Sequence, residues 1–286
     1  MRIRRNGYEI QVPSRIAVQS VVATSPVGAL ARRERILISA CLVIVTALAW
    51  GYLVHLDRQM SSSMEYDRMM REMGMNMNMP WTAADVFFTF TMWVVMMVGM
   101  MAGSAAPVLL LFGSARRARG PQGVPLAIFS FGAGYLLVWV GFSGCAALVQ
   151  WALHHAAMLS PMMAASSTRL GGAILIGAGL YQLTPVKGAC LTHCRSPLSF
   201  LVLHWRDGNV GALKMGIRHG AYCLGCCCAL MGVLFVVGVM NLVWVAVLTA
   251  FVLVEKIGPA GAVVARTAGA LMIVFGLLLA AGSWYS

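Results

Sequence analysis

Six long runs without a charged side chain constrain the fold of this chain most. They occupy residues 36–54, 86–112, 124–153, 170–186, 221–254 and 267–286. A helix that crosses a bilayer needs about 20 mostly apolar residues, and each run is near that length or longer. Only 10% of the residues are charged and 60% are hydrophobic, whereas soluble domains carry about 25% charged residues. The sequence therefore predicts an all-α, polytopic transmembrane helix bundle.

The run 221–254 is too long for one comfortable span. Residues 238–241, Gly-Val-Met-Asn, offer a turn inside it, so we divide it into two short helices. This division predicts about seven spans, with six as the alternative. We expect one transmembrane domain over residues 36–286, with a Met-rich outer loop at 55–82.

The basic residues predict the orientation of the spans. Residues 1–35 carry seven Arg, are interrupted by Pro13 and Pro26, and lack the apolar core and cleavage site of a signal peptide. We interpret them as a basic cytoplasmic tail. With the N-terminus inside, 17 of the 21 Lys and Arg residues fall in cytoplasmic segments, as the positive-inside rule requires. The net charge of +12 then indicates the lipid bilayer as partner and no nucleic acid.

The outer loop is rich in methionine. Four Met residues occupy alternate positions there: Met73, Met75, Met77 and Met79. Thioethers are soft ligands that favour Cu(I) and need no deprotonation, so this segment predicts copper capture. A low-complexity interfacial loop is the alternative interpretation.

The second apolar run carries a methionine stripe. Trp93 is followed at helical spacing by four Met residues: Met96, Met97, Met100 and Met101. These positions share one face of a helix. The stripe predicts either a path for a soft metal or a helix-packing interface, which is the more common use of methionine.

A first cysteine group follows the fourth run. Pro185 lacks an amide hydrogen and clashes with the carbonyl four residues earlier, so we expect a break there. If the next segment is helical, Cys190 and Cys194 share a face. Lys187 and Arg195 are close in sequence and would favour their thiolates.

A second sulfur stripe opens the fifth run at helical spacing: Cys223, Cys226, Cys227 and Met231. The predicted topology places both cysteine groups at the cytoplasmic side, where thiols stay reduced. We predict that the two groups lie together and form a metal or redox site. Three cysteines are interpreted only as small apolar side chains: Cys41, Cys145 and Cys228.

Two further segments have plain structural interpretations. Glu255 and Lys256, at the inner end of the sixth span, are expected to form a paired helix terminus whose charges reach water. The polar, Gly-rich stretch 205–220 is expected to be a cytoplasmic connector.

Three motifs resemble those of a family of uncharacterised bacterial integral membrane proteins that are predicted to bind metal. The first joins the methionine stripe to Pro107, Gly134, Tyr135 and Trp139. The second runs from Tyr181 through Pro185 to Cys190, Cys194 and Pro197. The third comprises Gly220, Cys223, Gly225, Cys226, Cys227, Leu230, Met231, Gly238, Met240, Asn241, Leu242, Glu255 and Lys256. The resemblance covers roughly residues 85–280 and implies a metal in a bacterial inner (cytoplasmic) membrane protein. Cys228 stands where an aromatic residue is expected, and it adds a thiol.

The leading hypothesis is a membrane protein that binds a soft metal, Cu(I), with zinc as the alternative. It would transport the ion or deliver it to a membrane cuproenzyme, with a copper chaperone as a further partner. The chain lacks a P-loop motif for ATP-driven pumping. A less favoured hypothesis is an enzyme, a membrane thiol-disulfide oxidoreductase that uses the Cys-x2-Cys spacing. The third is a structural subunit whose sulfur atoms only pack helices. No pattern indicates an oligomeric state.

Overall fold

The computed structural model describes residues 2–5, 8–11, 32–73, 81–120, 122–156, 158 and 167–282, and only the backbone of 61–68 and 70–72. These residues form nine helices: α2 (Arg32–Glu72), α3 (Ala83–Arg119), α4 (Val124–His155), α5 (Thr168–Gln182), α6 (Pro185–Arg195), α7 (Pro197–His204), α8 (Gly208–Val237), α9 (Leu242–Ile257) and α10 (Gly261–Ala280). Two short strands, β1 (Arg2–Arg5) and β2 (Tyr8–Gln11), pair antiparallel within the basic N-terminal tail. The prediction of a helical bundle is confirmed.

Five helices are long and apolar enough to cross a membrane, and the bent pair of α5 and α6 makes a sixth candidate. The sixteen residues of α9 extend about 24 Å, which is shorter than a hydrocarbon core of about 30 Å. The seventh span and the cytoplasmic N-terminus therefore stay predictions. The predicted division of the fifth run is confirmed, because α8 ends before Gly238 at φ 98° and Asn241 caps α9.

The predicted break at Pro185 is also confirmed. Helix α5 ends at Gln182, and α6 leaves it at an angle of 63°. The Thr184 hydroxyl caps the new helix by accepting a hydrogen bond from the Lys187 amide at 3.3 Å. The proline thus directs a short helix that carries Cys190 and Cys194 away from the axis of α5.

Two segments that we expected to be irregular are helical. Helix α2 continues to Glu72, because no Gly or Pro interrupts residues 52–73. Helix α8 begins at Gly208, so most of the predicted connector 205–220 is helical instead. Gly216 and Gly220 in this stretch are buried against α4, and a Cβ at Gly216 would overlap the carbonyl oxygen of Phe131. Small residues here serve close helix packing.

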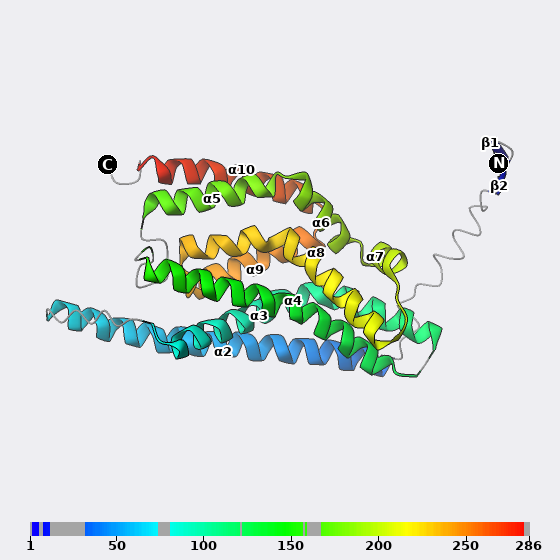
Figure 1. Cartoon of the computed structure of the whole chain (residues 1–286), viewed down its shortest axis with the longest axis horizontal. Helices are drawn as coiled ribbons and strands as arrows, with labels where there is room; N and C mark the ends of the chain where they lie inside the picture. Colours follow the sequence, from blue (N-terminus) through cyan, green and yellow to red (C-terminus); the bar gives the residue numbers. More distant parts are fainter. Residues whose placement is uncertain are drawn as a thin grey trace.

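The helices run roughly side by side along the long axis of the molecule (Figure 1). Helix α3 lies between α2 and α4, α4 packs along α8, and α5 packs along α10. We call the end where α3 begins the Asp85 end, and the end where α3 stops at Arg119 the basic end. Arg119 lies over the Trp205 ring at 3.7 Å, so the start of α8 belongs to the basic end.

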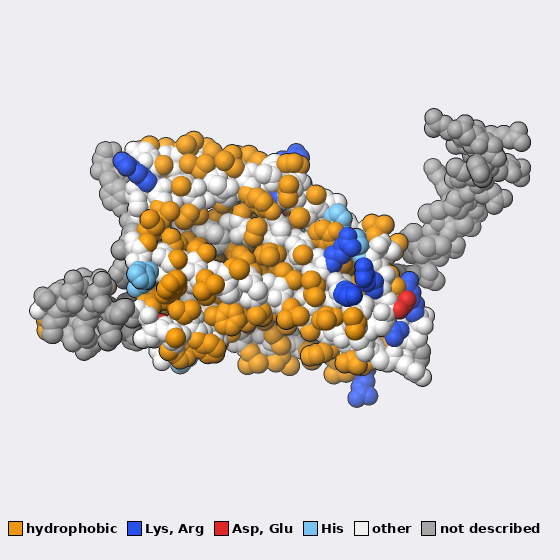
Figure 2. All heavy atoms as spheres, viewed as in Figure 1, with side chains coloured by type: hydrophobic (Ala, Val, Ile, Leu, Met, Phe, Trp, Pro, Cys, Tyr) orange, Lys and Arg blue, Asp and Glu red, His pale blue; other side chains and the backbone are white. Residues whose placement is uncertain are grey.

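The surface matches a membrane environment. Figure 2 shows hydrophobic side chains over most of the bundle, with Lys and Arg gathered toward the basic end. Large apolar side chains such as Val43 and Phe129 are 67% and 72% exposed, which a water-soluble surface rarely shows over so wide an area. The fold is consistent with a membrane protein.

We predict that Gly216→Ala destabilises the bundle, because the added methyl group forces α4 and α8 apart. Overpacking of this kind costs about 1–3 kcal/mol. Gly232→Ala in the same helix is the matched control, since a Cβ there meets nothing within 4 Å. It should leave stability unchanged or raise it by up to about 1 kcal/mol. Unfolding of both variants in detergent gives the comparison, and equal stability would contradict the close contact.

Candidate metal centre

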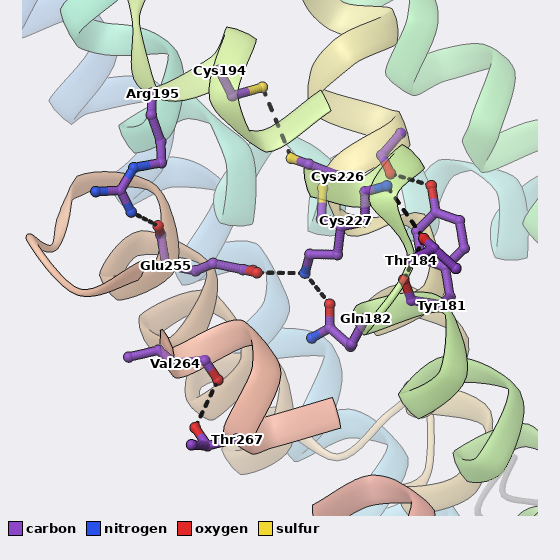
Figure 3. Close-up of polar contacts among 12 residues, drawn as sticks. Tyr181, Gln182, Thr184, Cys194, Arg195, Cys226, Cys227, Glu255, Val264 and Thr267 are labelled. Atoms are coloured by element: carbon purple, nitrogen blue, oxygen red, sulfur yellow. Dashed lines mark hydrogen bonds and ion pairs between the residues drawn. The ribbon is translucent and has the colours of Figure 1, made fainter. Parts of the chain in front are cut away.

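Two sulfur atoms from different helices face each other near the middle of the molecule. Cys194 Sγ of α6 and Cys226 Sγ of α8 lie 3.8 Å apart, and Figure 3 shows the two side chains pointing toward one another. Two metal–sulfur bonds of about 2.3 Å each can span at most about 4.6 Å. The pair therefore fits one soft metal ion with little adjustment.

The other predicted cysteines surround this pair. Cys226 Sγ and Cys227 Sγ both donate to the Cys223 carbonyl oxygen, at 3.0 Å and 2.8 Å. Cys190 Sγ contacts α8 where Gly225 leaves room, since a Cβ there would lie 2.8 Å from the sulfur. The prediction that the two cysteine groups lie together is thus confirmed as geometry. Within the described ranges, no group of three or more Cys, His, Asp or Glu side chains is arranged to hold a metal ion. We therefore place the candidate metal centre at the Cys194–Cys226 pair, whose sulfur atoms face each other.

The methionine stripe leads to the same place. Its four Met side chains are buried, each with an exposed fraction of 1% or less. At its inner end, Met101 Sδ lies 3.7 Å from Lys256 Nζ, which lies 2.9 Å from Cys223 Sγ. Met231 is fully buried one turn beyond Cys227. The sequence predicted the stripe and the cysteines separately, and the structure joins them at Lys256.

Lys256 is a site residue that sequence reasoning missed. The expectation that its charge reaches water is wrong, because its side chain is only 9% exposed and turns into the bundle. Its ammonium group donates to Cys223 Sγ and, at 3.3 Å, to Ser104 Oγ. Tyr135 Oη lies 3.1 Å from the same sulfur. These partners replace the water that a helix terminus would otherwise need.

Glu255 is also buried, with an ion pair to Lys187. The Lys187 ammonium additionally donates to Gln182 Oε1, and Arg195 donates to the carbonyl oxygens of Glu255 and Gly258, both at 2.7 Å. Figure 3 shows this network beside Cys194. The prediction that Lys187 and Arg195 favour thiolates is therefore wrong, because both cations are engaged with oxygen atoms. Their role is to fasten α6 to α9.

The predicted capture segment is described only in part. Met73 follows the last turn of α2 and is 58% exposed. Met75, Met77 and Met79 lie outside the described residues. Whether these thioethers collect metal stays a prediction.

Fold and site together define an all-helical, membrane-type protein with a buried cluster of soft sulfur ligands. The sequence model of the PpoB2 family, described as a copper chaperone family, matches residues 90–279. The chain belongs to this family. The matched range contains the methionine stripe and all five predicted cysteine ligands, while the Met-rich segment lies before it. No curated protein and no solved structure shows significant similarity to the chain.

We predict that breaking the buried ion pair destabilises the fold strongly. Lys187→Met leaves the Glu255 carboxylate buried without its partner, which costs about 3–5 kcal/mol. The double variant Lys187→Met/Glu255→Met should recover most of that loss, because no lone charge remains. The control is Arg117→Met, which breaks the half-exposed pair with Glu34 and should cost about 0–1 kcal/mol. Denaturant unfolding decides, and equal losses for Lys187→Met and Arg117→Met would contradict this assignment.

Proposed function

We propose that this chain is a membrane copper chaperone that holds Cu(I) between Cys194 and Cys226. It then passes the ion to a membrane cuproenzyme or across the bilayer. The observation that carries the proposal is the 3.8 Å approach of the two sulfur atoms inside the range matched by a copper chaperone family. The copper is cargo, so the site has to release it as well as bind it.

The ligand geometry favours Cu(I) over zinc. Structural zinc sites are four-coordinate and closed, whereas the two sulfur atoms that face each other here come from one cysteine on each of two helices. Soft sulfur ligands select Cu(I), and a facing pair of thiols satisfies an ion that accepts few ligands. Cys223 or Cys227 could join as a third ligand during transfer, because both lie within one helical turn of Cys226.

Charge balance supports the same assignment. Cu(I) bound by two thiolates carries a net charge of −1, and a lone charge inside the bundle is costly. The Lys256 ammonium contacts Cys223 in the same cluster, so it compensates the negative complex. Copper, two thiolates and one ammonium together are neutral.

The proposed route follows the sulfur atoms. Met73, Met75, Met77 and Met79 would collect copper at the Asp85 end, and the buried stripe from Met96 to Met101 would pass it by thioether exchange. The cysteine cluster would receive it toward the basic end. We assign the basic end to the cytoplasm of a bacterial inner membrane, on the distribution of Lys and Arg.

We predict that Cys194→Ser/Cys226→Ser removes the tight Cu(I) site and leaves only weaker binding by thioethers, because serine keeps roughly the size but removes the soft ligand. Copper analysis of the purified protein, with a competing Cu(I) chelator, measures the loss. The control is Cys41→Ser/Cys145→Ser, which changes two exposed cysteines outside the cluster. It should bind as tightly as the unchanged chain.

The same variants separate the chaperone from the oxidoreductase hypothesis. Two sulfur atoms 3.8 Å apart could also form a disulfide after a small side-chain rotation. If Cys194→Ser/Cys226→Ser keeps one Cu(I) per chain at full affinity but loses thiol–disulfide exchange, the chaperone proposal fails. The oxidoreductase hypothesis then takes its place.

We predict that copper binding releases protons. Both Cys226 and Cys227 donate hydrogen bonds to the Cys223 carbonyl oxygen, so these thiols carry their hydrogens. Thiols must lose them to bind metal, so one Cu(I) held by two cysteines releases about two protons. Apparent affinity should fall up to about 100-fold for each unit decrease in pH. Affinity that does not change with pH would indicate thioether ligands instead.

A further inference from the structure

Two neighbouring cavities, which share Leu56, Met92 and Met240 in their linings, occupy the Asp85 end of the bundle, outside the cysteine cluster. The outer cavity has a volume of about 630 Å³, and its lining includes Trp81 and Asp85 as well as Met92 and Met240. The inner cavity is far smaller, about 20 Å³, and is lined by apolar side chains and by one acidic residue, Asp57. Both are walled by α2, α3 and the segment that joins α8 to α9.

Methionines form the boundary between the two cavities. Met92 and Met240 line both, and Met96 lines the inner one. Met92 and Met96 are 3% and 1% exposed, so their sulfur atoms are withdrawn from bulk water. Met240 is half-buried and comes from the turn between α8 and α9. Three thioethers from two separate elements therefore converge on one small space.

This group continues directly into the methionine stripe. Met92, Met96 and Met100 follow one another at four-residue steps along α3, about 6 Å apart and on one face. Met101 completes the column beside Lys256 and Cys223. The cavities thus adjoin a column of methionines on α3 that ends at Met101, which contacts Lys256 beside Cys223.

We propose that Met92, Met240 and Met96 form a separate Cu(I) site, a thioether gate through which copper leaves the outer cavity and joins the stripe. This inference rests on the proposed copper function and adds a place of uptake to it. Met96 belongs to the methionine stripe of the sequence analysis, whereas Met92 and Met240 are distant in sequence and were not grouped with it.

The chemistry of the two cavities suits this role. A cavity that holds one water-sized particle needs about 10–15 Å³, so the inner one fits a single ion and excludes a hydrated one. Neutral thioethers accept Cu(I) without giving up protons, and the Asp57 side chain that lines the same cavity adds a carboxyl group beside them. At the mouth, the Asp85 carboxylate accepts hydrogen bonds from the Thr82 amide and hydroxyl at 2.7 Å and 2.6 Å. This fixed negative charge raises the local concentration of cations.

The test isolates thioether binding from cysteine binding. The background is the full chain with Cys194→Ser and Cys226→Ser, together with Met→Leu at the four Met-rich segment positions 73, 75, 77 and 79. In this background Met92→Leu/Met240→Leu is compared with Met215→Leu/Met272→Leu, a control that alters one methionine buried at the basic end and one in α10. Leu for Met conserves volume, and unfolding temperatures check that both variants fold.

Cu(I) affinity by chelator competition should fall at least tenfold for Met92→Leu/Met240→Leu and stay unchanged for the control. Selenomethionine-labelled background protein should show copper–selenium bonds by X-ray absorption, reduced in the test variant alone. Equal Cu(I) affinities in the two variants, or a background protein that binds no Cu(I), would contradict the proposed thioether site. Neither result would bear on the proposed site at Cys194 and Cys226. If the unchanged chain itself binds no Cu(I), the proposed function fails instead.

Discussion

The buried ion pair between Lys187 and Glu255 holds the candidate site together. Pro185 breaks the α5–α6 pair and turns α6 by 63°, which leaves a helix of only eleven residues to carry Cys194. A helix that short is marginal by itself. The ion pair to α9, supported by Arg195 on the α9 carbonyls, supplies the missing constraint. The distance between Cys194 and Cys226 depends on these contacts.

Burying a charged side chain is costly, so the partners of each buried charge indicate the role of that residue. Lys187 and Glu255 neutralise each other, whereas the hydrogen-bond partners of Lys256 in the described contacts are a thiol, a thioether and a hydroxyl. A lysine in such surroundings is stable only if a negative charge arrives or is already present. In the proposed function, a copper dithiolate would provide that charge. The two adjacent residues Glu255 and Lys256 thus have different roles, one structural and one electrostatic.

Much of the fold could be predicted from the sequence, because apolar runs, Pro185 and the 238–241 turn act locally. The pairing of the cysteine groups was also predictable, since each set has helical spacing and the predicted topology put both on the same side of the membrane, although α8 carries its cysteines in its middle rather than at an end. The partners of Lys256 and Glu255 were not predictable. A charged residue near a helix end reaches water in most proteins, and only the packing of α9 against α3 and α8 turns it inward. The start of α8 was missed because glycines that serve helix contact look like loop residues in sequence.

In the proposed route, the candidate ligands change from thioethers to cysteine thiols along the bundle. Affinity for Cu(I) would increase in that direction. At the thioethers copper keeps its full positive charge in surroundings of low polarity, so each of those stops binds it weakly. At the cysteines it meets thiols that can lose protons and so remove the charge. Lys256 would repel a bare Cu(I) ion, and it becomes favourable only once two thiolates have formed. Proton loss and copper arrival are therefore coupled at the point where the stripe meets the cluster, and returning a proton to a thiol is the physical step that would release the ion to a partner.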